Sequence, residues 1–166
     1  MPFFAAAKKE LSVSDVIDWV SELDGQVTCL RDFPAREARY GGFGRLDKRV
    51  AEALKRRGIT RLYSHQSEAA GWAMAGRDVV VATPTASGKT LCYNLPVLDA
   101  IVKDPGARAL YLFPTKALAQ DQLAELADFS TQLGGLFSSR TYDGDTPAAQ
   151  RLRARQANTV LANPDI

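Results

Sequence analysis

From residue 78 to residue 162, short apolar blocks alternate with longer stretches that have helical spacing. The blocks lie at 78–82, 107–113, 136–142 and 158–162. The helical stretches lie at 89–103, 116–133 and 147–156. The first two blocks are almost continuously apolar, as expected for strands covered on both faces. This alternation predicts an α/β fold with a mostly parallel sheet and right-handed crossovers.

The first part of the chain has a different pattern. Helical spacing is found at 12–23 and 46–58, and the residues between them are rich in proline, glycine and arginine. A further short helix is expected at 64–76. The sequence therefore predicts two parts, a small helical leader at 1–60 and an α/β unit at 61–166.

Composition excludes several classes of protein. With 166 residues, 46% of them hydrophobic and 24% charged, the chain is long enough for a folded globular domain. No apolar run approaches the roughly 18 residues that span a membrane. Cys29, Cys92 and the single histidine, His65, do not make a zinc pattern, and two distant cysteines favour reduced thiols in a cytoplasmic protein. A net charge of +2 is compatible with nucleic-acid binding but does not indicate it.

The junction after the first apolar block contains Gly88-Lys89-Thr90 at the start of a helical stretch. Unpaired N–H groups and the helix dipole attract phosphate at such a position. Gly88 allows close approach of the backbone, Lys89 would contact the β- and γ-phosphates, and the Thr90 hydroxyl would hold Mg²⁺. These residues predict a nucleotide site.

The nucleotide-loop pattern is incomplete. It requires a glycine five residues before Gly88, where this chain has Thr83. Ala86 stands where many helicases have another glycine. By itself, the triplet is equally compatible with a solvent-exposed lysine at an ordinary strand–helix turn.

Several motifs around the triplet occur in a fixed order. They are LYSHQ (62–66), TPTASGKT (83–90), PTKALAQDQ (114–122), YDGDT (142–146) and NPD (163–165). Together they resemble the superfamily 2 helicases, in particular their DEAD/DEAH-like first motor domain. The nearest resemblance is to the bacterial mitomycin-repair-type helicases and their RecQ-four-like eukaryal relatives. The stretch FPAREARY (33–40) also resembles the leader segment of that branch.

The resemblance implies a RecA-like fold and an ATP site. Gln66 would recognise the adenine edge through its amide, and Tyr40, Phe43 or Tyr63 could stack on the base. Lys89 and Thr90 would be the catalytic residues of the loop. The residues implied to bind ATP are Gln66, Thr85, Ala86, Ser87, Gly88, Lys89 and Thr90. His65 is expected to pack beside this pocket, and Cys92 to be a buried structural thiol.

The resemblance also implies contacts with a nucleic-acid backbone. The residues concerned are Thr115, Lys116, Gly144, Asn163 and Pro164. Each has a simpler alternative: a helix N-cap for Thr115, an Asp-Gly turn around Gly144, and a strand-ending turn at 163–164. The basic run at 151–155 is expected to be a solvated helix face.

The function implied is that of an ATP-dependent DNA helicase that uses ATP and Mg²⁺ and moves 3′ to 5′ on single-stranded or partly duplex DNA during repair. Catalysis in that family needs an acidic motif, expected beyond Ile166, and arginines from a second RecA-like domain. The expectation is therefore a truncated first motor domain that binds nucleotide weakly without turnover. A non-catalytic nucleic-acid-binding or protein-binding module and another kind of P-loop ATPase are the alternatives, and YSHQ and PTKAL disfavour the latter.

Overall fold

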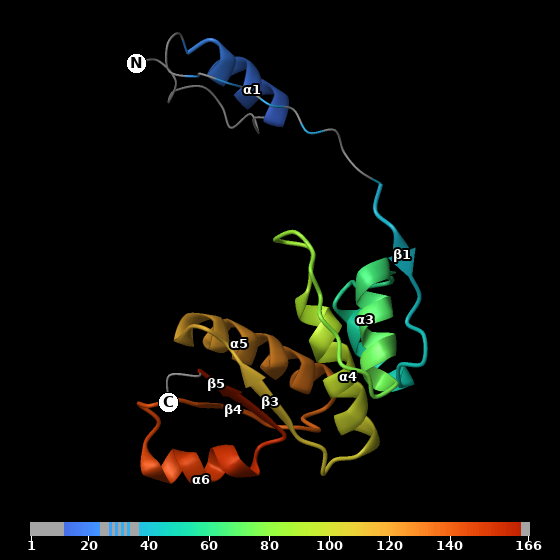
Figure 1. Cartoon of the computed structure of the whole chain (residues 1–166), viewed down its shortest axis with the longest axis vertical. Helices are drawn as coiled ribbons and strands as arrows, with labels where there is room; N and C mark the ends of the chain where they lie inside the picture. The colour runs from blue at the N-terminus through green and yellow to red at the C-terminus, as the bar shows by residue number, and fades with distance from the viewer. Residues whose placement is uncertain are drawn as a thin grey trace. The chain divides into compact units, whose positions relative to one another are not determined.

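A computed structural model of the chain describes residues 12–23, 27, 29, 31, 33 and 37–163. Contacts divide the chain into two units, 1–37 and 38–166 (Figure 1). Because the helix at 48–56 packs within the second unit, the division predicted near residue 60 does not coincide with a break in the packing.

The first unit contains helix α1 (Val13–Ser21), within the stretch predicted at 12–23. A capping box starts it. The Ser12 side chain accepts from the Asp15 N–H at 3.1 Å, and the Asp15 carboxylate accepts from the Ser12 N–H at 2.8 Å. None of the residues of α1 is buried.

The second unit contains a three-stranded parallel sheet in the order β3–β5–β4. Its strands are β3 (Ala109–Leu112), β4 (Ser139–Tyr142) and β5 (Thr159–Ala162). Helix α5 (Lys116–Gln132) connects β3 to β4, and α6 (Ala148–Gln156) connects β4 to β5. The two helices lie on opposite faces of the sheet (Figure 1). The predicted α/β class with a parallel sheet is confirmed.

Three further helices and a short ribbon complete this unit. The helices are α2 (Lys48–Arg56), α3 (Ser64–Met74) and α4 (Thr90–Lys103), close to the predicted ranges. The ribbon pairs β1 (Tyr40–Gly41) with β2 (Leu62–Tyr63) in antiparallel register. The sequence did not predict it, because two-residue strands leave no periodic pattern.

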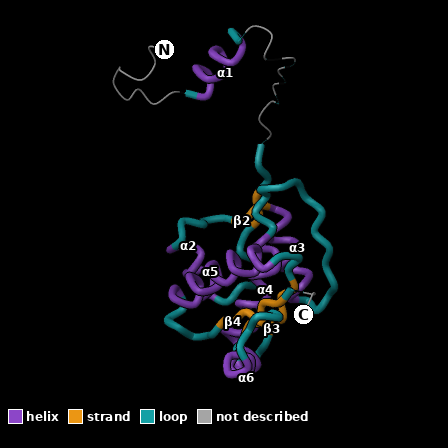
Figure 2. Tube along the Cα trace, turned by 90° about the vertical axis from the view of Figure 1, so that its left-hand side faces the viewer, coloured by secondary structure: helices purple, strands orange, loops and turns teal. Residues whose placement is uncertain are grey.

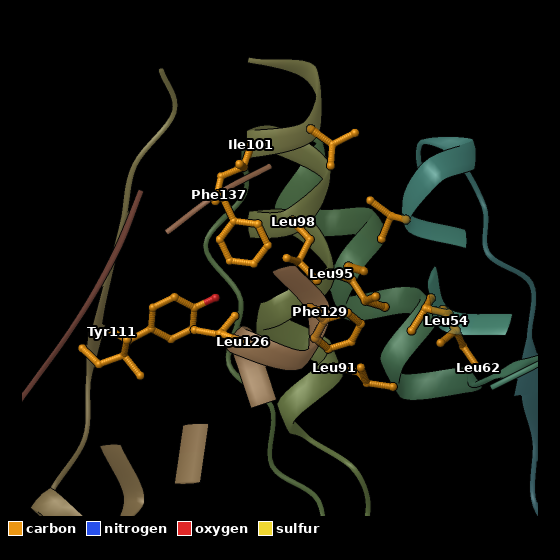
Figure 3. Close-up of a cluster of buried hydrophobic side chains, with 14 of the residues drawn as sticks. Leu54, Leu62, Leu91, Leu95, Leu98, Ile101, Tyr111, Leu126, Phe129 and Phe137 are labelled. Carbon is orange, nitrogen blue, oxygen red and sulfur yellow. The ribbon is translucent and has the colours of Figure 1, made fainter. Parts of the chain in front are cut away.

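The core of the second unit lies around α4. Leu91, Leu95, Leu98 and Ile101 recur every three or four residues, so they share one face of the helix. They pack with side chains from α2, β2, β3 and α5 (Figure 3). The fully buried members include Leu54, Leu62, Leu95, Leu98, Ile101, Leu126 and Phe129. This cluster holds the start of α4 in place relative to the sheet.

The prediction of a strand at 78–82 is wrong. These residues form neither helix nor strand, and Figure 2 shows this part of the chain as loop. Val80 is 94% exposed. A strand needs a neighbour for its N–H and C=O groups, and within the described part of the chain none pairs with 78–82. A groove of about 880 Å³, lined by Val79, Val81, Ala109 and Phe113 among others, lies beside it.

Candidate nucleotide and nucleic-acid site

The loop before α4 contains two residues with a left-handed backbone. Ala86 has φ +58° and Gly88 has φ +73°, so both lie in the left-handed region. The loop leads into α4, which begins at Thr90 without a side-chain cap, whereas Asp47 and Thr115 cap α2 and α5. The Leu91 and Cys92 N–H groups donate to the carbonyls of Gly88 at 3.3 Å and Lys89 at 2.9 Å, and the positive end of the helix dipole lies at this loop, which favours an anionic ligand.

Lys89 turns back onto its own loop. Its Nζ donates to the carbonyl oxygens of Thr83 at 2.9 Å and Pro84 at 2.6 Å. The Thr83 and Ser87 hydroxyls are 2.6 Å apart and hydrogen-bonded. The alternative of a solvent-exposed lysine at an ordinary turn does not describe this arrangement, because Lys89 is half-buried and its ammonium group is hydrogen-bonded to the loop. Phosphate oxygens are stronger acceptors than carbonyls for such a group.

Helix α3 holds the loop from one side. The Gln66 side chain is only 3% exposed, and its Nε2 donates to the Gly88 carbonyl at 2.8 Å. Its Oε1 accepts from the Tyr63 N–H at 2.9 Å. The His65 Nε2 lies 2.9 Å from the Ser87 carbonyl and donates to it. His65 thus lies beside the loop as predicted, but its contact with Ser87 was not foreseen.

The Gln66 amide therefore has protein partners at both ends. Recognition of adenine by this residue stays a prediction, and it would require the amide to exchange a backbone contact for the base. What the structure establishes is that Gln66 positions Gly88.

Two of the three candidate aromatic residues lie together. The rings of Tyr40 and Tyr63 stack with centroids 5.4 Å apart, and Tyr63 stacks on His65 at 5.8 Å. The Arg61 guanidinium lies 3.6 Å from the Tyr40 ring centre. Phe43 instead packs against the core. The three stacked rings thus run from Tyr40 in β1 through Tyr63 to His65, which contacts Ser87.

Cys92 lies one turn into α4 and is buried, as predicted. Burial raises the pKa of its thiol, which keeps the group protonated and unreactive. It has a structural role in the packing beneath the loop.

The residues predicted to contact nucleic acid lie just after the three strands of the sheet. Thr115 caps α5 by accepting from the Leu118 N–H at 3.3 Å. The Asn163 amide donates to the Pro114 carbonyl at 3.0 Å, which joins the loops after β5 and β3. Lys116 forms an ion pair with Asp145 in the loop after β4. Pro164 lies outside the described residues.

Arg151 supports the loop that contains Gly144. Its Nε donates to the Thr146 carbonyl at 2.9 Å, and a terminal nitrogen donates to the Gly144 carbonyl at 3.3 Å. Its guanidinium also lies 5.7 Å from the Tyr142 ring centre. The predicted solvated face is exposed, but Arg151 has this additional structural role.

These features define an α/β domain with a Gly-Lys-Thr loop at the start of one helix and a row of polar loops at the carboxyl ends of its parallel strands. Residues 63–166 match the family model of the DEAD/DEAH box helicases, and the chain belongs to that family.

Two curated relatives extend the comparison. The uncharacterized ATP-dependent helicase YprA of Bacillus subtilis is 53% identical over 122 residues, which are 73% of this chain and 16% of that protein. The ATP-dependent helicase hrq1 of Schizosaccharomyces pombe is 37% identical over 168 residues, covering 95% of this chain and 16% of that protein. The chain thus spans about a sixth of the length of these relatives.

Solved helicase structures have the same fold. The DUF1998 helicase MrfA, bound to DNA and AMPPNP, superposes with a TM-score of 0.84 and 45% identity over 93% of this chain and 22% of that chain. The helicase Lhr of Mycobacterium smegmatis, bound to ssDNA and AMP-PNP, gives a TM-score of 0.65 and 25% identity over 74% of this chain and 17% of that chain.

Proposed function

We propose that these 166 residues form the ATP-binding portion of an ATP-dependent DNA helicase. The observation that carries the proposal is the position of Lys89, whose ammonium group donates to two carbonyls of the loop at a helix start without a side-chain cap. Membership of the DEAD/DEAH box family supports it, as do relatives named ATP-dependent helicases and a similar structure that holds DNA and AMPPNP.

In this proposal Lys89 exchanges two carbonyl oxygens for phosphate oxygens of ATP, and the positive end of the α4 dipole attracts the same phosphates. Residues 85–90 surround the phosphates, and Gln66 and His65 keep Ser87 and Gly88 in place from α3. Hydrolysis and strand separation belong to a longer polypeptide, in which a second motor domain supplies the arginines that this reaction uses.

Mg²⁺ fits the chemistry of this loop. When bound with ATP, the ion would neutralise phosphate charge. Thr90, the first residue of α4, offers the hydroxyl oxygen that would hold it. Among the described residues, no group of three or more His, Cys, Asp or Glu side chains could hold a metal ion. In this proposal the ion would take its other ligands mainly from the nucleotide phosphates and from water, as Mg²⁺ commonly does.

The nucleic-acid partner in this proposal is single-stranded or partly duplex DNA. The loops after β3, β4 and β5, with Thr115, Lys116, Gly144 and Asn163, would contact its backbone. Movement from 3′ to 5′ and a role in repair are parts of the same proposal, and the family resemblance supports them. A cytoplasmic location is also proposed, because the two distant cysteines do not make a disulfide framework.

The test is binding of a fluorescent ATP analogue to the 166-residue chain with Mg²⁺. Lys89→Ala is expected to weaken binding at least about tenfold, because charge-assisted hydrogen bonds to phosphate are lost. Lys55→Ala, on the exposed side of α2, is the control and should bind like the unchanged chain. Equal binding by Lys89→Ala and the unchanged chain would overturn the proposal.

A second candidate is a nucleic-acid-binding module without turnover. The hydrogen bond between Asn163 and Pro114 and the Lys116–Asp145 pair favour it, because they organise the strand-end loops independently of the P-loop. Such a module would bind single-stranded DNA in a salt-dependent way, with the same affinity in the presence and absence of ATP.

A further inference from the structure

The Lys116–Asp145 ion pair joins two of the loops proposed to contact DNA. Lys116 is the first residue of α5 and follows β3, whereas Asp145 follows β4. These strands are not neighbours, because β5 lies between them. The pair therefore connects the two outer loops across the middle strand.

The turn that carries Asp145 is built by its own hydrogen bonds. The Asp143 carboxylate accepts from the Asp145 N–H at 3.0 Å and from the Thr146 hydroxyl at 3.0 Å. The Thr146 hydroxyl oxygen in turn accepts from the Asp143 N–H at 2.9 Å. The Arg151 guanidinium donates to the Gly144 and Thr146 carbonyls of the same turn. Asp143 is thus used inside the turn, while the Asp145 carboxylate reaches across to Lys116.

In the ion pair, Asp145 occupies the Lys116 ammonium group, to which a DNA phosphate would otherwise bind. Asp145 is 83% exposed and Lys116 is 53% exposed, so water and ions reach both. Ion pairs at such exposure stabilise folded proteins little. A phosphate oxygen and a carboxylate oxygen make the same kind of charge-assisted hydrogen bond to an ammonium group. One can therefore replace the other without disturbing the core.

We propose that Asp145 competes with the DNA backbone for Lys116, so that binding of a phosphate at Lys116 releases the loop after β4 from the loop after β3. This inference rests on the nucleic-acid role proposed above. Asp145 sets how tightly and how salt-dependently the strand-end loops hold DNA, and its carboxylate is the stand-in for a phosphate when DNA is absent.

The competition predicts a particular pattern of affinities for fluorescein-labelled single-stranded DNA, measured by anisotropy on the 166-residue chain. Asp145→Asn is expected to tighten binding about three- to tenfold at low salt, because Lys116 no longer has an internal partner. Lys116→Ala is expected to weaken binding. In the Lys116→Ala background, Asp145→Asn should have no more effect than the control Glu52→Gln, which removes one exposed carboxylate from α2.

This cycle separates competition from general repulsion. If Asp145→Asn tightens binding equally in both backgrounds, the carboxylate acts on DNA through its charge alone, and the proposed competition is overturned. If Asp145→Asn leaves affinity unchanged while Lys116→Ala weakens it, the competition is also overturned, but the DNA-binding role of Lys116 stands.

A measurement without DNA tests the pair itself. Lys116 lowers the pKa of the Asp145 carboxyl, chiefly through their hydrogen bond. In a titration followed by NMR, Lys116→Ala should return that pKa towards its ordinary value. An unchanged pKa would overturn the inference. If the pKa responds but no variant binds single-stranded DNA at low salt, the proposed nucleic-acid role fails, and the role of Asp145 fails with it.

Discussion

Gln66 joins the start of α3 to the loop before α4, because its Nε2 donates to the Gly88 carbonyl at 2.8 Å while its Oε1 accepts from the Tyr63 N–H at 2.9 Å. Both bonds are made by a side chain that is almost fully buried. The loop geometry therefore depends on a residue 22 positions earlier in the chain. A buried amide of this kind orders a loop because losing either partner leaves a polar group unsatisfied.

Gln66→Ala is expected to destabilise the chain by about 1–3 kcal/mol, because two partly buried hydrogen bonds between this side chain and the backbone are lost. Nucleotide affinity should also fall, since Gly88 is no longer held. The two measurements are chemical denaturation and binding of the fluorescent ATP analogue.

The matched control is Ser67→Ala on the same helix. The Ser67 hydroxyl donates to the Gly42 carbonyl at 2.8 Å rather than to the loop that contains Gly88, so this variant should lose some stability and keep its nucleotide affinity. If both variants bind nucleotide as tightly as the unchanged chain, Gln66 does not position the loop.

Ala86→Gly is expected to stabilise the chain by about 1 kcal/mol. Ala86 has φ +58°, and a left-handed conformation costs a non-glycine residue roughly 1–3 kcal/mol. The greater freedom of glycine in the unfolded chain removes about 0.4–1 kcal/mol of that gain. Denaturation curves of the two proteins give the difference, and a loss of stability would show that Ala86 is not strained.

Gly88→Ala is expected to have the opposite effect. Gly88 has φ +73°, and an added Cβ would lie 2.6 Å from the Gln66 Nε2. The substitution therefore introduces backbone strain and displaces the Gln66 amide. It should lower both the free energy of unfolding and the nucleotide affinity, whereas Ala86→Gly should leave affinity intact. Equal affinity in the two variants would contradict the close approach at Gly88.

Asp47→Ala is expected to cost about 1 kcal/mol at neutral pH, because Asp47 is the N-cap of α2 and accepts from the Arg49 N–H at 2.9 Å. Hydrogen bonds from Arg49 lower the pKa of Asp47 from 3.8 to about 2. A lowered folded-state pKa means that the stabilisation is present above pH 3.8 and is lost as the pH falls towards 2.

The measurement is the free energy of unfolding between neutral pH and pH 2. The difference between the unchanged chain and Asp47→Ala should shrink across the acid window. Asp47→Asn keeps a capping oxygen but does not titrate. The free energy of unfolding of that variant should therefore lack the part of the acid dependence that comes from Asp47. A constant difference down to pH 2 would show that Asp47 is not the titrating cap.

Local patterns predicted the helices and the parallel strands because each is set by residues close together in the chain. The cap of α5 by Thr115 and the burial of Cys92 follow from the same local signals. The predicted strand at 78–82 failed, although its residues favour a strand, because pairing needs a neighbour that local sequence does not reveal.

The contacts that organise the site were not predictable in the same way. Gln66 meets Gly88 over 22 residues, and Lys116 meets Asp145 over 29. Such pairs depend on how elements pack, which periodicity does not specify. A positive φ at Ala86 could have been suspected, since helicases often have glycine there, but only the backbone establishes it.

Leu98→Ala is expected to destabilise the second unit by about 2–5 kcal/mol, because it removes a fully buried side chain from the face of α4 that carries the core. In Figure 3 Leu98 points into the cluster beside Leu95 and Phe137. Leu152→Ala on α6 removes the same atoms from a residue that is 63% exposed, and it should change stability by less than about 0.5 kcal/mol. Denaturation of both variants decides the matter. Similar losses would mean that α4 is not the centre of the core, and that the start of the helix, with Lys89 and Thr90, is not held by that packing.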